Sequence, residues 1–497
     1  MIFKSILIAA LVCAGTVFLF QSCKNNATGT VEESAGDSTA LIMPRTPEWH
    51  RNATIYEVNL RHYTPEGTFA SFEQHIARLK EMGIDILWFM PIHEVSVKER
   101  KGELGSPYAV TDYRGVNPDM GTMDDFKHML AAIQAAGMHC IIDWVPNHTG
   151  WDSKWITEHP DWYTHDADGN VTDPINAETG ESWGWTDVAD LNYDNAEMRL
   201  AMIDAMKFWV EDIGIDGFRV DVAHGVPVDF WVQCATALYE VKPLFMLAEA
   251  EVPELLNTGA FQMDYGWEMH HTLNEIAKSQ GANRDAAKKL VQGNLVEGED
   301  AKVEKKTALD IDVVLAKKAK VYTKGYHMQF TSNHDENSWA GTEFARMGDG
   351  HKAFAVLTAT FDGMPLVYSG QESAMDKQLE FFKKDEIPWG DYAYAGFYKT
   401  LFDLKHRNKA LWNGVHGGPL VKIPTGNDEN VYAFSREKDG DKVVVIINLS
   451  AVDQEIKLQG SGYAGNYNNV FSNSSTELAE GMTLKMGSWD YLVLSSK

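Results

Sequence analysis

Four apolar stretches of the sequence each end in a carboxylic acid, and these acids are the residues whose type and position could do chemistry. They are Asp143, Asp221, Glu249 and Asp335. Two carboxyl groups that flank a glycosidic bond can cleave it, because one protonates the leaving oxygen while the other attacks the anomeric carbon or activates water. The separation of Asp221 and Glu249 along the chain is that of one strand plus one helix. This spacing predicts that they stand on adjacent strands and converge on one pocket.

The surroundings of Asp221 favour different protonation states for the acids, one as proton donor and one as ionised nucleophile. Crowding of several carboxylates raises the pKa of one of them, so that a proton donor persists near neutral pH. Arg219 lies two residues before Asp221 and, on a strand, would face the same side. Its fixed positive charge is expected to keep Asp221 ionised, as a nucleophile requires. A third carboxylate can stabilise a positively charged transition state.

The elements that must carry these acids are short apolar runs that alternate with helical patterns. Such a pattern predicts an α/β fold with a parallel sheet, and about eight strand–helix units close into a (β/α)8 TIM barrel. The predicted strands span residues 54–58, 84–90, 138–145, 215–222, 244–249, 261–265, 326–331 and 363–369. Helical patterns cover residues 72–82, 123–136, 198–213 and 350–360. Catalytic groups of such a barrel lie at the carboxyl ends of its strands, where the four acids stand.

Further segments interrupt or follow the barrel pattern, which we assign to residues 46–411. The connection after the third strand is too long for one helix, so residues 146–192 are predicted to form a small inserted subdomain. It holds five of the fifteen tryptophans, of which we expect at least three to pack in its core. Residues 283–324 are lysine-rich and predict a pair of surface helices. Residues 412–497 alternate in polarity between turn signals, which indicates a C-terminal antiparallel β-sandwich.

The start of the chain has the pattern of an export signal. The apolar run at residues 6–20 is shorter than the roughly 20 residues of a membrane span, which predicts a signal peptide over residues 1–22. The Ser-Cys pair that follows resembles a bacterial lipobox, so Cys23 is expected to carry lipid and residues 23–45 to form a polar tether. The predicted location is a membrane-anchored lipoprotein at the cell surface or in the periplasm. The alternative is an ordinary signal peptide and a soluble periplasmic or secreted protein.

The net charge of −27 disfavours nucleic acid and anionic lipid as electrostatic partners of the folded domains. A neutral substrate is compatible with this charge. The four cysteines show neither the spacing of a zinc site nor that of a disulfide framework.

Several stretches resemble motifs of the α-amylase family, glycoside hydrolase family 13. Asp143-Trp-Val-Pro-Asn-His is similar to the first motif, and Gly217-Phe-Arg-Val-Asp to the second, which holds the nucleophile. Ala248-Glu stands where the acid/base lies, and Phe330-Thr-Ser-Asn-His-Asp is similar to the fourth motif. Gly363-Met-Pro-Leu-Val-Tyr-Ser-Gly-Gln-Glu resembles the motif of the eighth strand. Five ordered motifs together are specific, although each alone would be weak.

The resemblance implies a retaining mechanism through a covalent glycosyl-enzyme. Asp221 would be the nucleophile, Glu249 the acid/base and Asp335 the transition-state stabiliser. The implied substrates are α-1,4-glucans such as starch and maltodextrin. Further residues would bind the substrate: Tyr108, Asp143, His148, Arg219, His224 and His334. Many family members carry Lys-His where this chain has His224-Gly225, which leaves the leaving-group side of the site and the preferred chain length open.

The resemblance also implies a structural calcium ion and no organic cofactor. Asn147 matches one family ligand through its amide oxygen, Asp190 matches a second, and the carbonyl of Gly225 stands at the third position. The alternative is that Asn147 and Asp190 hydrogen-bond the insertion to the barrel without a metal.

Two other functions remain open at this point. The same machinery could act on cyclodextrin or pullulan, as cyclomaltodextrinases and neopullulanases do, or transfer the glycosyl group to another sugar. A catalytically inactive glucan-binding or scaffold protein is the alternative from a different class. Such proteins typically lose the carboxylates, whereas this chain keeps all of them.

Overall fold

The computed structural model describes residues 45–176, 179–281, 288–291, 294–297 and 305–497. The predicted signal peptide, the lipidation site Cys23 and nearly all of the predicted tether lie outside these residues. Among the helices that are described, none is long and apolar enough to cross a membrane.

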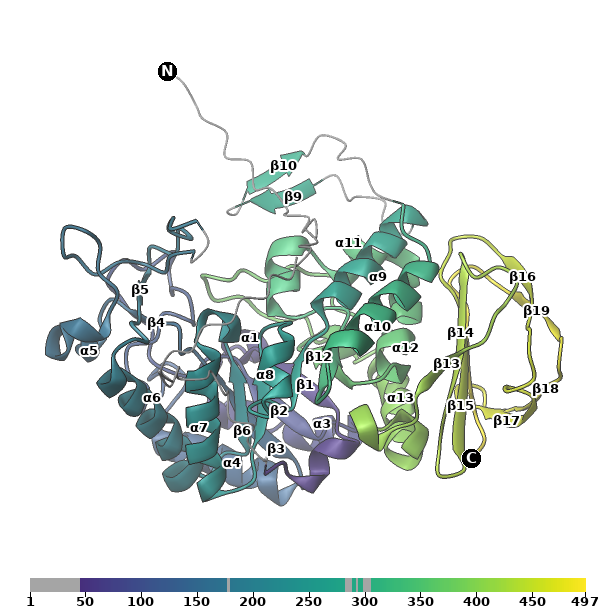
Figure 1. Cartoon of the computed structure of the whole chain (residues 1–497), viewed down its shortest axis with the longest axis horizontal. Coiled ribbons are helices and arrows are strands. Elements are labelled where there is room, and N and C mark those ends of the chain that lie inside the picture. Colours follow the sequence, from purple (N-terminus) through teal and green to yellow (C-terminus); the bar gives the residue numbers. More distant parts are fainter. Residues whose placement is uncertain (1–44, 177–178, 282–287, 292–293, 298–304) are drawn as a thin grey trace, which may run out of the picture. The chain divides into compact units, whose positions relative to one another are not determined.

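Within the described chain, eight parallel strands close into a barrel, as the sequence predicted (Figure 1). Their order around the barrel is β1–β12–β11–β8–β7–β6–β3–β2. The strands are β1 (Ile55–Val58), β2 (Ile86–Phe89), β3 (His139–Trp144), β6 (Gly217–Val220), β7 (Phe245–Ala248), β8 (Met263–Tyr265), β11 (Tyr326–Gln329) and β12 (Met364–Tyr368). Each predicted strand is present, with ends that differ by a few residues.

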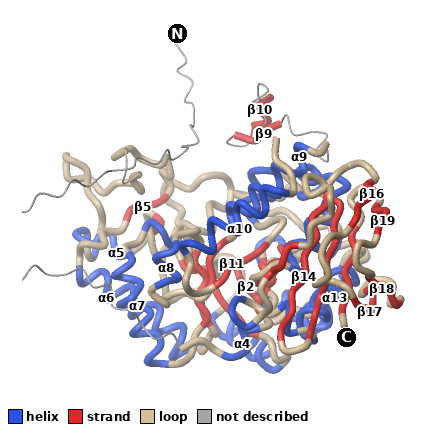
Figure 2. Tube along the Cα trace, turned by 45° about the vertical axis from the view of Figure 1, so that its right-hand side comes forward, coloured by secondary structure: helices blue, strands red, loops and turns tan. Residues whose placement is uncertain are grey.

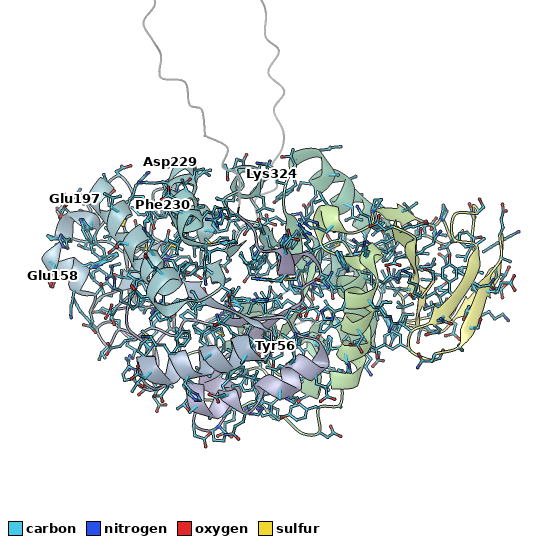
Figure 3. The ribbon with its side chains drawn as sticks, turned by 90° about the horizontal axis from the view of Figure 1, so that it is seen from below. Tyr56, Glu158, Glu197, Asp229, Phe230 and Lys324 are labelled. Carbon is cyan, nitrogen blue, oxygen red and sulfur yellow. The ribbon has the colours of Figure 1, made fainter. Side chains whose placement is uncertain are left out.

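Helices surround the red strands of the barrel (Figure 2). They are α1 (Leu60–Tyr63), α2 (Phe69–Glu73), α3 (Ile76–Met82), α4 (Met123–Ala135), α6 (Ala196–Phe208), α7 (Val228–Val241), α8 (Pro253–Asn257), α9 (Trp267–Ser279), α10 (Leu309–Val321), α11 (Glu343–Met347), α12 (His351–Thr360) and α13 (Ala395–Arg407). The helix predicted over residues 72–82 is divided into α2 and α3 at Gln74 and His75. Exposed acids such as Glu197 of α6 and Asp229 of α7 lie along the outside, whereas Tyr56 of β1 lies within (Figure 3).

The alternation of side chains along the strands decides which residues can reach the chemistry. Tyr56 and Val58 of β1 pack toward the helices, whereas Ile55 belongs to the cluster that fills the barrel. Because successive side chains on a strand point to opposite faces, Glu57 points into the barrel with Ile55. The same rule directs Arg219 of β6 inward, because its neighbours Phe218 and Val220 pack toward the helices.

The insertion after β3 forms a small antiparallel pair, β4 (His148–Gly150) and β5 (Val188–Asp190), together with the short helix α5 (Lys154–Glu158). The prediction for its tryptophans is confirmed. Trp162 is buried, and Trp151 and Trp155 pack against the main core. Trp183, by contrast, is 53% exposed.

The C-terminal part is antiparallel, as predicted. A six-stranded sheet has the order β13–β14–β15–β20–β17–β18, and a two-stranded sheet pairs β16 with β19. Apolar residues from both sheets form one cluster, which makes the sandwich core. The strands are β13 (Leu420–Lys422), β14 (Val431–Lys438), β15 (Asp441–Asn448), β16 (Gln454–Lys457), β17 (Gly465–Asn469), β18 (Ser475–Leu478), β19 (Thr483–Met486) and β20 (Tyr491–Ser495).

The helix pair predicted over residues 283–324 is only half correct. Helix α10 is present, but the earlier part contains two paired antiparallel strands, β9 (Lys288–Val291) and β10 (Asn294–Glu297). Each of these strands carries a Leu-Val pair, and β-branched residues favour strands over helices. The helix was predicted from the lysine content of this stretch, which did not outweigh the strand preference of these pairs.

Candidate active site

The carboxyl ends of the barrel strands border a cavity of about 1330 Å³. The three predicted catalytic acids, Asp221, Glu249 and Asp335, all line it. Pockets for single small ligands usually measure about 300–1,000 Å³, so this cavity has room for several linked sugars.

Arg219 of β6 holds three carboxylates together beneath this cavity. Its side chain is fully buried, and Nη1 donates to Oδ1 of Asp143 and to Oδ1 of Asp221, both at 2.8 Å. Nη2 lies 2.9 Å from Oε1 of Glu249. Since β6 and β7 are neighbours in the barrel, the acids that follow them emerge side by side, as their spacing predicted.

The turn after β6 fixes the orientation of these acids. Val222 adopts a left-handed conformation with φ 43° and ψ 43°, which is strained for a β-branched residue. In this conformation its N–H donates to Oε2 of Glu249 at 2.8 Å. The backbone N–H groups of Asp221 and Glu249 each bond to a carbonyl of the preceding strand, at 2.8 Å. The strain at Val222 therefore coincides with a direct link between the two acids.

The pKa values of the acids are shifted in different directions. Burial raises the pKa of Glu249, but Arg219 and the N–H of Val222 outweigh burial and lower it below its usual range. Burial raises the pKa of Asp221 well above its usual range, and the charge of Glu249 raises it further. Arg219 acts in the opposite direction, as expected, but does not outweigh burial. Burial likewise raises the pKa of Asp335, against the charge of His334. Two carboxylates in such contact titrate as a pair, and the pair Asp221–Glu249 supplies the proton that acid catalysis needs.

A buried acid that the sequence analysis missed, Glu57 of β1, sets the charge of His334. Oε1 of Glu57 lies 2.5 Å from Nδ1 of the ring, and Oδ2 of Asp335 lies 3.4 Å from Nε2. Burial lowers the pKa of His334, but Asp335 and Glu57 outweigh burial and raise it to about 9. His334 is therefore a cation at neutral pH. The signal in the sequence was a charged residue inside the apolar run Ile55–Val58, a place that acids occupy mainly when paired.

The residues expected to bind substrate fall into two groups. Tyr108, His148, His224 and His334 line the cavity. The Tyr108 ring stacks on His334 with centroids 5.5 Å apart, and burial lowers the pKa of His148 to about 4, which leaves that ring neutral.

Asp143 and Arg219 form the second group, because both are fully buried and neither is among the residues that line the cavity. The two Asp143 oxygens accept hydrogen bonds from Arg219, from Nε1 of Trp88 and from the hydroxyl of Tyr108. In this structure both residues position the groups that line the cavity.

Aromatic side chains line the cavity beyond the acids. Trp183 and Trp185 of the insertion stack on each other with centroids 6.0 Å apart, and Trp185 also contacts the His148 ring edge-on at 5.9 Å. Trp267, at the start of α9, lines another part of the cavity. Flat, partly exposed rings of this kind can stack on the apolar faces of sugars.

The three predicted calcium ligands all line the cavity, and two of them lie close to each other. Asn147, Asp190 and Gly225 line the same cavity, and a methyl group added at Gly225 would come within 2.6 Å of Oδ1 of Asn147. Their amide, carboxylate and carbonyl oxygens are the hard donors that calcium prefers. The described residues contain no group of three or more His, Cys, Asp or Glu suited to a metal, so any such site depends on the amide and carbonyl oxygens.

Two family models match nearly the whole chain. Residues 26–418 match the model described as Alpha amylase, catalytic domain. Residues 422–493 match the model described as Maltogenic Amylase, C-terminal domain.

Individual proteins agree with these matches. Alpha-amylase MalA of Haloarcula japonica is 24% identical over 443 residues, which cover 85% of this chain but only 59% of that protein. The crystal structure of a maltogenic alpha-amylase, AmyB of Thermotoga neapolitana, has 27% identity and a TM-score of 0.75 over 89% of this chain and 98% of that one. An alpha-amylase structure from Lactobacillus plantarum has 26% identity and a TM-score of 0.74, over 90% and 99% of the two chains.

Proposed function

Because the chain belongs to the α-amylase family and is a glycoside hydrolase, we propose that it cleaves α-1,4-glucosidic bonds of starch, maltodextrins or related α-glucans with retention of configuration. The observation that carries this proposal is the arrangement around Arg219. One guanidinium contacts Asp221 at 2.8 Å and Glu249 at 2.9 Å, and both acids line a cavity large enough for an oligosaccharide.

In the first step, an oxygen of Asp221 forms a bond to the anomeric carbon. The bond from that carbon to the leaving sugar breaks, its electron pair stays on the glycosidic oxygen, and Glu249 delivers its proton there. This step needs the shared proton on Glu249 and the charge on Asp221. A glycosidic oxygen beside Glu249 offers a hydrogen-bond acceptor to the protonated acid, which favours that distribution once substrate is bound.

In the second step, Glu249 removes a proton from water, and the water oxygen forms a bond to the anomeric carbon. The bond to Asp221 breaks, and its electron pair returns to the carboxylate. Asp335 and the buried acids stabilise the positive charge that develops in both transition states. Two inversions at one carbon give overall retention.

The test is Asp221→Asn, compared with Asp229→Asn as a control on the exposed surface of α7. The first variant should fold normally and lose several orders of magnitude in kcat on maltoheptaose, because no covalent intermediate can form. The control should match the wild type. Proton NMR of the first products should show the α anomer, and an initial β anomer would contradict retention.

The same experiment separates the alternatives. Chromatography of the products from soluble starch, maltodextrins, cyclodextrin and pullulan distinguishes an α-amylase from a cyclomaltodextrinase or neopullulanase. Products longer than the starting maltoheptaose would indicate glycosyl transfer. Binding of glucan without any cleavage would indicate an inactive binding protein.

A calcium ion is a second part of the proposal, with Asn147, Asp190 and the Gly225 carbonyl among its ligands. Such an ion would join the insertion to the loop after β6 and so stabilise the wall beside the acids. Chelation should then lower the Tm, and added calcium should restore it by mass action. An unchanged Tm in excess chelator, with no metal in elemental analysis, would rule the ion out and leave hydrogen bonding alone as the role of these residues.

Export with a lipid anchor is the third part, and it rests on the sequence around Cys23. Cells that express the full chain should retain the enzyme in the membrane fraction, and Cys23→Ser should release it. Wild-type enzyme found wholly in the soluble fraction would favour the ordinary signal peptide.

A further inference from the structure

Three segments that are far apart in the sequence contact one another at the lining of the catalytic cavity. They are residues 96–105, residues 183–187 of the insertion, and Phe381 with Phe382. Lys101, Trp183, Asp187 and Phe382, which line the cavity, come from all three.

An ion pair, in which the lysine side chain is 36% exposed and only the acid is buried, joins the first two segments. Nζ of Lys101 lies 2.8 Å from Oδ1 of Asp187 and 3.3 Å from the carbonyl oxygen of Gly184. The Asp187 side chain is only 8% exposed. Lys101 is therefore the cation that pairs with Asp187.

Backbone contacts join the first segment to the third. The N–H of Leu104 donates to the carbonyl of Phe382 at 2.9 Å. Gly102 has φ +66° and packs so closely on Phe382 that a methyl group there would lie 2.5 Å from its Cβ. Arg61 completes the contact, because Nη1 donates to the carbonyls of Gly105 at 2.9 Å and Phe381 at 3.2 Å.

Another part of the cavity lining has a different character. It comprises His224, Gly225 and Pro227, all of which are exposed, and Trp267, which is half-buried. These residues follow strands β6 and β8. Longer substrate can leave the cavity on this side.

The roles of Asp221 and Glu249 indicate where the glycone and the leaving sugar of the substrate would lie in the cavity. The sugar that bonds to Asp221 is expected to lie on Tyr108, whose ring stacks on Phe381 of the joined segments with centroids 6.4 Å apart. The sugar that departs takes its proton from Glu249, and the nearby Glu251 accepts a hydrogen bond at 2.8 Å from the N–H of Glu268, the residue after Trp267. The glycone part of the substrate therefore points at the joined segments.

We propose that the Lys101–Asp187 wall, meaning residues 96–105 joined to 183–187 and to Phe381–Phe382, closes the glycone end of the cavity and makes this an enzyme that cleaves from non-reducing chain ends. The inference rests on the proposed function. A closed glycone end excludes the continuation of a glucan chain beyond the wall, so only a chain terminus can occupy it. The products are short maltooligosaccharides of fixed length, with α configuration.

The experiment compares two forms of maltoheptaose, one free and one with an acetal across O4 and O6 of its non-reducing glucose. The wild type should cleave the blocked form more than about 100-fold more slowly than the free form. Early products from the free form should be dominated by a single short sugar. Equal rates on the two forms would contradict the proposal that the wall closes the glycone end, but would leave the proposed function intact. No cleavage of either form would contradict the proposed function itself.

Two variants test the residues that make the wall. Lys101→Met removes the ion pair, and Gly102→Val forces residue 102 away from Phe382. Lys101→Met should raise the rate on the blocked form relative to the free form by about tenfold, the worth of one charge-assisted hydrogen bond, and Gly102→Val should change this ratio in the same direction. Lys399→Met, which removes the exposed pair with Asp403 on α13, is the matched control and should leave the ratio unchanged. A ratio unchanged in both wall variants would overturn the assignment, and the wild-type comparison stands even if a variant fails to fold.

Discussion

Replacement of Glu57 by Gln tests whether a buried acid of β1 sets the charge of His334. The substitution keeps the size of the side chain and removes its charge. In the folded protein the pKa of His334 is raised from the ordinary 6.5 to about 9. This corresponds to about 3 kcal/mol of extra stability for the protonated ring. Because Asp335 and Glu57 share the effect, loss of Glu57 should remove roughly 1–2 kcal/mol of it.

The sign of the pH dependence follows from the direction of this change. A histidine whose pKa is higher in the folded state contributes stability that is complete below about pH 6.5 and is lost as the pH rises through about 9. The wild type should therefore lose stability between neutral pH and pH 9 or above. In Glu57→Gln the loss should begin at lower pH, and the alkaline limb of kcat/KM should move in the same direction.

The assay combines a pH–rate profile on maltoheptaose with thermal unfolding at a series of pH values. Glu73→Gln is the matched control, since Glu73 also pairs with a histidine, His128, at 2.7 Å. The His128 side chain is 76% exposed, so loss of this pair should change stability by less than about 1 kcal/mol. An alkaline limb at the same pH in Glu57→Gln and the wild type would refute the role assigned to Glu57.

Three other substitutions give separate tests. Arg219→Lys should lower kcat about 100-fold or more, because an ammonium group cannot replace the planar fork that contacts three acids, and steady-state kinetics would measure this. Trp183→Ala should raise KM for long maltodextrins by up to about tenfold with little change in kcat, if its exposed ring stacks on sugar. Arg436→Met should lower the free energy of unfolding in urea by about 2–4 kcal/mol and leave kcat/KM unchanged at 25 °C, because buried Arg436 donates to the carbonyl of Phe361 at 2.6 Å and joins the C-terminal sheet to the barrel.

The parts of the site that could be predicted from the sequence are those encoded by local pattern. Apolar runs that end in Asp221 and Glu249 predict both the strand and the catalytic role of the acid at its carboxyl end, because a parallel barrel places the carboxyl ends of its strands at one face. The expectation that at least three of the five tryptophans of the insertion pack in a core is also correct. In each case the information lies within a few neighbouring residues.

The parts that could not be predicted depend on contacts between distant segments. Glu57 and His334 are far apart in the chain, and only barrel closure brings β1 next to the loop after β11. The Lys101–Asp187 pair joins a loop to the insertion, and no periodicity marks either residue. The burial of Arg219 is a further case. Its sequence position indicated that it faces Asp221, but only the packed structure shows that it is fully buried and is not among the residues that line the cavity.

The charges around the cavity floor do not balance, and this imbalance explains how the site favours reaction over binding. Five acids surround two cations: the acids are Glu57, Asp143, Asp221, Glu249 and Asp335, and the cations are Arg219 and His334. A neutral glucan gains little from this excess of negative charge in the ground state. When the glycosidic bond breaks, positive charge develops on the sugar ring directly above the acids. An interaction that appears only in the transition state raises kcat and not affinity. The burial that raises the pKa of Asp221 therefore also strengthens its attraction for that charge, because both effects grow as the local dielectric constant falls.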